Sequence, residues 1–251
     1  MRSTNNKQFV TASSLSLLGL LLSCLACSPS NPKPAHPLTD NVVVIPTPQS
    51  TAYLLLGSEK AALIDSGSSP AASQIMRALQ DRGIKPERVR AIFTTAPHRH
   101  LSGGAWAFKR AVTYIGEKDH RVLLADKLPK ALLPKIKARL SPRPNVPHAI
   151  NNVYPGDHIR AHGFELDVIG TPGVSRDSMM YLFNEILFTG EGLLIKDGQF
   201  ALPGAYQVAS EKEVQQSLSR LTDLKFHTVA DGHGNIARLG PKDIETFIAS
   251  L

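Results

Sequence analysis

The chain has 251 residues, of which 42% are hydrophobic, and its net charge is +7. This size allows one domain with a sizeable hydrophobic core. The two cysteines, Cys24 and Cys27, both lie near the N-terminus, which excludes a fold held together by internal disulfides. The positive charge is modest and no nucleic-acid recognition motif accompanies it, so we expect no nucleic-acid partner.

The first 23 residues have the three parts of a secretory signal peptide. Arg2 and Lys7 stand in a polar start without acidic residues, and an apolar run follows over residues 12–22. This run is about half of the ~20 residues that a membrane-spanning helix needs. We therefore predict that residues 1–23 are a signal peptide that is cleaved.

The end of this segment, Leu21-Leu22-Ser23-Cys24, resembles a lipobox. Cys27 is the poorer candidate for lipidation, because Cys24 and not an aliphatic residue stands three positions before it. We predict a protein anchored to the cell envelope by lipid on Cys24, at the outer membrane facing the periplasm if the cell is Gram-negative. A cleaved, soluble secretory protein is the alternative. If Cys24 carries the lipid anchor, the membrane is the first expected partner.

The segment that follows is polar and rich in proline. Such a composition cannot bury enough apolar surface to fold and is typical of an extended linker. We predict that residues 24–41 form a lipidated tether and that residues 42–251 form the folded domain.

The domain begins with alternating strand and helix signals. Short apolar or β-prone runs over residues 43–45, 52–56 and 61–65 predict three strands. A helix is expected from Pro70 to Gln80, followed by a buried strand over residues 91–95. Gly103-Gly104 is expected to lead into a helix that carries Trp106 and Phe108.

The second half repeats this plan. Leucines and isoleucines at helical spacing, with lysines and arginines between them, predict a helix with a solvated basic face over residues 127–143. Strands are expected near residues 164–169, 179–183, 186–188 and 228–230, and helices near residues 211–221 and 241–249. Strands mixed with helices in both halves predict an α/β domain with a ligand site between the halves.

Residues with metal-binding chemistry stand at the ends of these predicted strands. His98 and His100 follow the strand that ends at Thr95. Two imidazoles separated by one residue can face the same side of an extended segment, and imidazole and carboxylate groups are ligands of zinc. Glu191 and His233 follow two later strands.

Taken in order, these segments resemble the motifs of the metallo-β-lactamase superfamily. Thr95-Ala-Pro-His98-Arg-His100-Leu101-Ser-Gly-Gly104 aligns without a gap on Thr-His-x-His-x-Asp-His-x-Gly-Gly. The other similar segments are Ala62–Gly67, Gly170–Ser178, Leu187–Glu191 and Asp231–Gly234. The resemblance implies an αβ/βα four-layer sandwich, in which two mixed β-sheets are flanked by helices and the site lies along their rim.

The same resemblance shows three histidine positions of the family occupied by apolar residues. Ala96 and Val174 stand where two of the three histidines of the first metal would be, and Leu101 replaces a histidine of the second metal. A metal ion cannot lose most of its ligands without losing most of its binding free energy. The family's two-metal centre is therefore not expected.

Four residues keep or replace ligands at the other positions. His98 and His233 match family histidines, His100 replaces an aspartate, and Glu191 replaces the bridging aspartate. This set suits one divalent metal ion, most simply zinc, with iron or manganese as alternatives. A site that holds no metal is the other interpretation.

Two classes of function follow from this set. One is a metal-dependent hydrolase of the envelope, acting on an ester, thioester, amide or phosphodiester. The other is a non-catalytic pseudoenzyme that binds a small molecule or a partner at the old active site. In both, Asp65 is expected to orient the loops of the site, and Asp177 to hold the Thr-Pro-Gly turn.

Overall fold

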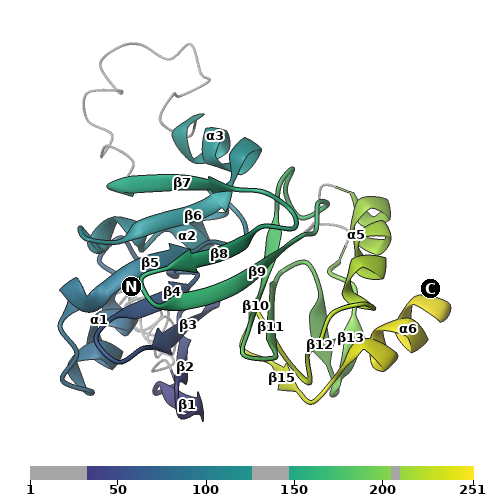
Figure 1. Ribbon diagram of the computed structural model, residues 1–251, viewed down its shortest axis with the longest axis horizontal. Coiled ribbons are helices and arrows are strands. Elements are labelled where there is room, and N and C mark those ends of the chain that lie inside the picture. The colour runs from purple at the N-terminus through teal and green to yellow at the C-terminus, as the bar shows by residue number, and fades with distance from the viewer. Residues whose placement is uncertain (1–32, 126–146, 205–209) are drawn as a thin grey trace, which may run out of the picture. The chain divides into compact units, whose positions relative to one another are not determined.

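Two mixed β-sheets face each other in the computed structural model (Figure 1), which describes residues 33–125, 147–204 and 210–251. Within these residues the first sheet contains, in spatial order, β1 (His36–Thr39), β2 (Val42–Pro46), β3 (Thr51–Leu56), β4 (Ala61–Ile64), β5 (Val89–Phe93), β6 (Val112–Gly116) and β7 (Ala149–Val153). The second contains β15 (Ile236–Ala237), β14 (Thr228–Asp231), β11 (Ile186–Gly190), β10 (Met179–Phe183), β9 (Phe164–Gly170) and β8 (His158–Ala161). A separate hairpin pairs β12 (Leu194–Lys196) with β13 (Gln199–Ala201).

The core lies between the two sheets because successive strand residues point to opposite faces. In β10, Met179, Tyr181 and Phe183 belong to the cluster between the sheets, whereas Met180 and Leu182 belong to the cluster on the outer face. Both faces of such a strand are buried, which explains its uninterrupted apolar sequence.

Helices cover the outer face of each sheet. The apolar cluster outside the first sheet includes residues of α1 (Ser73–Gln80) and of the 3-10 turn η2 (Ala105–Ala107). The cluster outside the second sheet includes residues of α5 (Glu211–Leu218), η3 (Ser219–Leu221) and α6 (Pro241–Ala249). The remaining helical elements are η1 (Pro86–Arg88), α2 (Arg99–Ser102) and α3 (Glu117–Ala125). This helix, sheet, sheet, helix order confirms the predicted four-layer sandwich.

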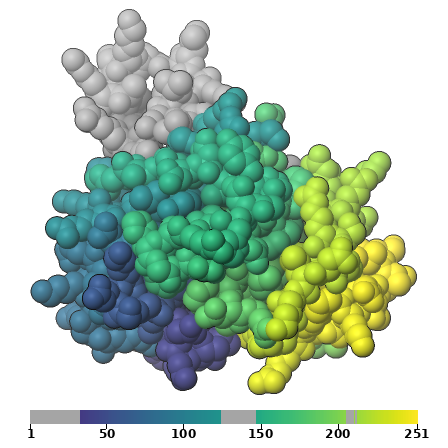
Figure 2. All heavy atoms as spheres, viewed as in Figure 1, coloured from purple at the N-terminus to yellow at the C-terminus, as the bar shows by residue number. Residues whose placement is uncertain are grey.

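The hairpin of β8 and β9 shows how closely the two halves of the chain pack. Phe164 and Leu166 of β9 share a core cluster with Val42, Tyr53 and other residues of the first sheet. In the space-filling view the green atoms of this hairpin lie over the blue and teal atoms of the first half (Figure 2). Within the described residues, none of the helices has the length and apolar character needed to cross a bilayer.

Three predictions from the sequence differ from the structure or lie outside it. The folded unit begins at Lys33 and not at Val42, because residues 36–39 of the expected tether pair with β2 as strand β1. The expected helix around Trp106 is only a three-residue 3-10 turn. The expected basic helix over residues 127–143 lies outside the described residues.

A buried tyrosine joins the two sheets near the predicted site. Tyr53 of β3 is 2% exposed, and its hydroxyl donates a hydrogen bond of 2.5 Å to the backbone oxygen of Asp231 at the end of β14. Its ring packs against Phe188 of β11, with 5.0 Å between ring centroids. One side chain thus ties the first sheet to two strands of the second.

Tyr53→Phe removes this hydrogen bond and keeps the ring. We expect the free energy of unfolding, measured with urea, to fall by about 1 kcal/mol, because a buried carbonyl loses a donor. Tyr154→Phe is the control: its ring is 51% exposed, so the change should stay within about 0.5 kcal/mol. Equal stability of the Tyr53 variant and the wild type would contradict the proposed link.

Candidate metal centre

The site lies where the carboxyl ends of strands from both sheets meet. Asp65 directly follows β4, and His98 follows β5 in the first sheet. Glu191 directly follows β11, and His233 lies two residues after β14 in the second. These last two ends are bonded to each other, since the amide of Gly232 donates to the carbonyl of Gly190 over 2.6 Å.

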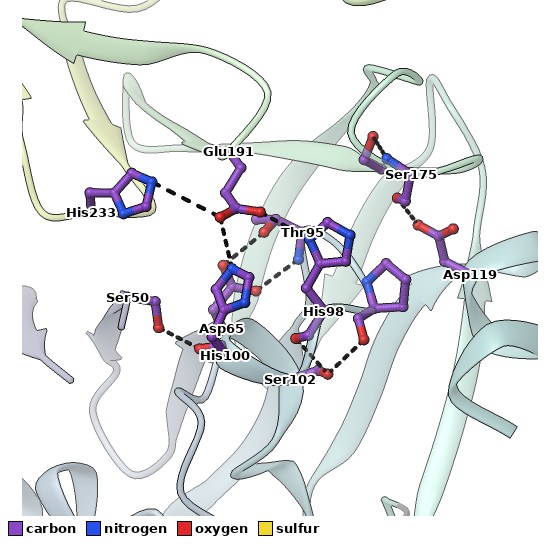
Figure 3. Close-up of polar contacts among 12 residues, drawn as sticks. Ser50, Asp65, Thr95, His98, His100, Ser102, Asp119, Ser175, Glu191 and His233 are labelled. Carbon is purple, nitrogen blue, oxygen red and sulfur yellow. Dashed lines mark hydrogen bonds and ion pairs between the residues drawn. The ribbon is translucent and has the colours of Figure 1, made fainter. Parts of the chain in front are cut away.

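The carboxylate of Glu191 is the centre of the arrangement (Figure 3). Its side chain is 6% exposed, and it accepts hydrogen bonds from Nδ1 of His98 over 2.9 Å and from Nε2 of His100 over 2.7 Å. Nε2 of His233 lies 4.0 Å from Oε1 of Glu191. The ligand atoms of His98, His100 and Glu191 lie within 4.8 Å of one another, whereas His233 stands at the edge of this group.

The two neighbouring histidines reach Glu191 in a different way from the one predicted. His98 has extended backbone dihedrals, but His100 lies in the short helix α2. The expectation of one extended segment is therefore wrong for His100. The hydroxyl of Ser50, between β2 and β3, donates to the carbonyl of His100, so a loop far away in sequence helps to hold the helix. No sequence motif indicated Ser50.

Mutual hydrogen bonding sets the charge of the group. Burial alone would raise the pKa of Glu191, but the hydrogen bonds from His100 and His98 outweigh it and lower this pKa to about 2. The same bond raises the pKa of His100 above its usual value. Without a metal ion, the carboxylate is therefore ionised and held by imidazole N–H groups.

Asp65 holds the loop that carries His98 and His100 through hydrogen bonds from Thr95. It is 2% exposed, and its two carboxylate oxygens accept hydrogen bonds from the amide (2.9 Å) and the hydroxyl (2.8 Å) of Thr95. Burial raises the pKa of Asp65 to about 7 despite these bonds, and the negative charge of Glu191 adds to the rise. Because Thr95 begins the loop to His98, Asp65 holds the loop that carries both histidines.

Asp231 supports the other side of the site, a role that the sequence analysis did not predict. Its buried carboxylate accepts hydrogen bonds from the amides of His233 and Asn235, both 2.9 Å, and from the amide of Ile195 over 3.0 Å. It therefore joins the loop that presents His233 to the segment that follows Glu191. Its place beside His233 in the sequence was the available signal.

Asp177 does not bond His98, His100 or Glu191, but bonds helix α3 instead. Its carboxylate accepts hydrogen bonds from the amide and the ammonium group of Lys118, over 2.8 and 3.0 Å. Buried Asp119, which the sequence did not indicate, accepts from the hydroxyl of Ser175 and from the amide of Asp177. Together these bonds tie residues 175–177 to α3. The Thr-Pro-Gly turn itself is bonded by Ser178, whose hydroxyl donates to the carbonyl of Thr171 over 2.6 Å.

The comparisons with known proteins agree with this geometry. The family model described as the metallo-beta-lactamase superfamily matches residues 45–233, three quarters of the chain. The chain therefore belongs to the metallo-β-lactamase superfamily, as its motifs predicted. A search of curated protein sequences found no match.

Solved structures resemble the fold at low sequence identity. A metallo-beta-lactamase family protein from Thermus thermophilus has a TM-score of 0.65 at 22% identity, covering 85% of this chain and 80% of its own. BJP-1, a subclass B3 metallo-beta-lactamase of Bradyrhizobium japonicum, has a TM-score of 0.65 at 18% identity. The match covers 88% of this chain and 91% of the BJP-1 chain. A B3 metallo-beta-lactamase with an active-site glutamic acid has a TM-score of 0.65 at 17% identity. The match covers 87% of this chain and 90% of that enzyme's chain. At these identities the likeness concerns the fold alone.

The residues present fit one metal ion but not the family's pair. Two nitrogen donors and one carboxylate converge within 4.8 Å, a donor set that zinc, iron and manganese all accept. Ala96, Leu101 and Val174, which stand at three family histidine positions, are at most 4% exposed and pack together as a separate apolar cluster. These apolar side chains offer no ligand atom at the three positions, and the described residues hold no other group of three donors.

The acid stability of the metal-free protein tests the bonds of Glu191. In the folded protein the pKa of Glu191 is about 2, below its ordinary value of 4.5. The contribution of Glu191 to the free energy of unfolding is therefore complete above pH 4.5 and is lost as the pH falls towards 2. In EDTA, Glu191→Gln should remove on the order of 2–3 kcal/mol at neutral pH and flatten this part of the pH profile.

Glu165→Gln is the control, because the Glu165 side chain is 63% exposed and its loss should change little. Urea unfolding between pH 2 and pH 7 measures both variants. Parallel pH profiles of wild type and Glu191→Gln would show that the two histidines do not stabilise the carboxylate.

Proposed function

We propose that this chain is a hydrolase of the cell envelope whose centre binds one divalent metal ion through His98, His100 and Glu191. The observation that carries the proposal is the convergence of these three donors at the meeting ends of two sheets. The proposed substrates contain an ester, thioester, amide or phosphodiester bond. Zinc is the proposed ion, with iron and manganese as the ions to compare.

Each ligand residue has a defined part in this proposal. His98 presents Nδ1, His100 presents Nε2, and Glu191 presents both oxygens of a buried carboxylate. To bind a cation at these atoms, each imidazole must present a lone pair there, so its proton would move to the other ring nitrogen or to water. Acid pH protonates both nitrogens and removes the lone pair, so binding should weaken there. A divalent ion in such a site lowers the pKa of bound water and makes it a nucleophile near neutral pH.

The neighbouring residues hold the loops of the proposed ligands and add apolar surface beside them. Asp65 and Asp231 hold the loops of His98 and His233 through hydrogen bonds to Thr95 and to the His233 amide. The buried cluster of Ala96, Leu101 and Val174, of which Ala96 and Leu101 lie within two residues of the histidines in sequence, would give the site an apolar wall. We assign to His233, whose Nε2 lies 4.0 Å from Oε1 of Glu191, the part of a fourth ligand or of a proton acceptor at Nε2.

A non-catalytic binding protein is the second candidate, and one observation favours it. Glu191 bonds both histidines directly, at 2.7 and 2.9 Å, so the three groups satisfy one another without an ion. The old site would then hold a small ligand or a partner. The two candidates differ in metal dependence, which an experiment can measure.

Elemental analysis and metal titration separate the candidates. The hydrolase should bind no more than one divalent ion per chain. His100→Ala and Glu191→Ala should each weaken binding at least about 100-fold, because the loss of even a hydrogen-bond partner of a ligand costs 10- to 100-fold. His158→Ala is the matched control, since His158 is exposed and bonded to Asp167 on the β8–β9 hairpin.

Turnover on a panel of β-lactam, ester, thioester and phosphodiester substrates completes this test. We expect metal-dependent hydrolysis that is slow compared with a two-metal centre, because each ion contributes several kcal/mol to lowering the barrier. It should vanish in His100→Ala and persist in His158→Ala. A protein that binds its ligand without metal and shows no turnover would support the binding-protein candidate instead, and two tightly bound ions would refute both descriptions of the centre.

The envelope location is also proposed from the Leu-Leu-Ser-Cys24 segment. Cys24→Ser should leave the precursor without lipid and move the protein out of the membrane fraction, because an acyl anchor and not a spanning helix would hold it there. Cys27→Ser is the control and should leave the protein in that fraction. Release by the control change, and not by Cys24→Ser, would assign the anchor to Cys27.

A further inference from the structure

The end of the domain opposite the metal centre is strongly basic. It consists of the amino ends of β4, β5 and β6 with the adjoining turns, whereas the centre lies at the carboxyl ends of β4 and β5. Residues 57–60, 85–90, 109–110 and 161–163 form this basic end. It carries six cations and two carboxylates, Glu59 and Glu87; the cations are Lys60, Lys85, Arg88, Arg90, Lys109 and Arg110.

Hydrogen bonds and packing bring these segments together. The guanidinium of Arg88 donates to the carbonyls of Ser58 and Glu59, over 2.9 and 2.6 Å, which ties it to the β3–β4 turn. Nε of Arg90 donates to the carbonyl of Arg110 over 3.2 Å. Gly57 of the same turn lies against the ring of Phe164 next to the β8–β9 turn. The four segments therefore form one surface.

The cations of this surface are not neutralised by the protein. Within the described residues none of the six forms an ion pair with a carboxylate, whereas four Lys or Arg side chains elsewhere in the domain do. His162 in the β8–β9 turn is close enough to Arg90 and Lys60 for their charges to lower its pKa, after burial as the larger cause. The positive charge is thus left for an external anion.

We propose that the basic end docks on the anionic headgroups of the membrane that carries the protein. This docking proposal rests on the proposed envelope location. Only eight residues separate Cys24 from Lys33, so a lipid on Cys24 keeps the folded unit within about 30 Å of the membrane. At that distance the local concentration of headgroups is high.

The first strand of the folded unit ends at this surface: β1 begins nearer the metal-centre end, because the three antiparallel pairings from β1 to β4 each reverse the direction of the chain. Strand β1 runs towards the turn at Asn41, whose carbonyl accepts a hydrogen bond of 2.8 Å from the amide of Leu56, next to the β3–β4 turn. Asp40 in that turn adds one negative charge and leaves the surface with an excess of cations. Docking there would turn the metal centre away from the membrane, towards water-soluble substrates.

Vesicle sedimentation of the chain Lys33–Leu251 tests this inference without the lipid anchor. The described core clusters lie within this unit, and circular dichroism checks its folding. Vesicles contain about one third phosphatidylglycerol in phosphatidylcholine, or phosphatidylcholine alone. We expect binding to the anionic vesicles only, and its loss between ~0.05 and ~0.5 M NaCl because salt screens exposed charges.

The decisive variant carries Lys60→Glu, Lys109→Glu and Arg110→Glu, whose side chains make no hydrogen bond or ion pair within the described residues. Each cation near an anionic surface contributes about five-fold to binding, so we expect at least a tenfold loss. The matched control carries Lys196→Glu, Arg238→Glu and Lys242→Glu, three exposed cations that lie in β12, directly after β15 and in α6. It has the same net charge and should change binding less than about twofold.

Four outcomes would overturn the inference. These are an equal loss in the control, an unchanged triple variant, displacement from vesicles by millimolar glycerol phosphate, which indicates a soluble phosphate ligand, or equal binding to duplex DNA. The metal content of the triple variant should match the wild type. Failure of the metal proposal would therefore leave the vesicle result intact, and the reverse also holds.

Discussion

The buried carboxylate of Glu191 is the constraint on which the site depends. A carboxylate with 6% of its side chain exposed cannot remain ionised unless hydrogen-bond donors or cations surround it. Here two imidazoles fill that need, and they come from the loop and short helix that follow β5 of the other sheet. The loops on both sides must therefore be held in place, which explains the buried carboxylates of Asp65 and Asp231 and the hydroxyl of Tyr53 beneath them.

The replacement of the family's ligands follows a physical pattern. A lone histidine left at Ala96, Leu101 or Val174 would be a buried polar group without its metal, at a cost of about 1–3 kcal/mol. The three apolar residues instead pack against one another. The donors that remain are gathered around Glu191, so the polar and apolar parts of the old centre are separated. Such a separation supports the proposal of a centre with at most one ion.

The two ends of the domain have different chemistry. The carboxyl ends of the strands carry mutually bonded acids and imidazoles, whereas the amino ends carry cations that no carboxylate of the described residues pairs with. Loops at opposite ends of the same strands can change independently, because the packed sheets between them stay the same. The proposed membrane-facing surface and the proposed metal centre can therefore coexist on one small domain.

The order of short motifs resembled the metallo-β-lactamase superfamily, and this resemblance predicted the family and the four-layer sandwich. It also singled out His98, His100, Glu191 and His233 as candidate ligands. Strand β1 escaped prediction, since its exposed, proline-containing sequence becomes a strand only by pairing with β2. The support given by Ser50, Asp119 and Asp231 depends on loops brought together by folding. Only the folded chain determines that His98 and His100 share one carboxylate and that Ala96, Leu101 and Val174 touch. Such contacts join residues as many as 93 positions apart, and residue spacing along a chain carries no record of them.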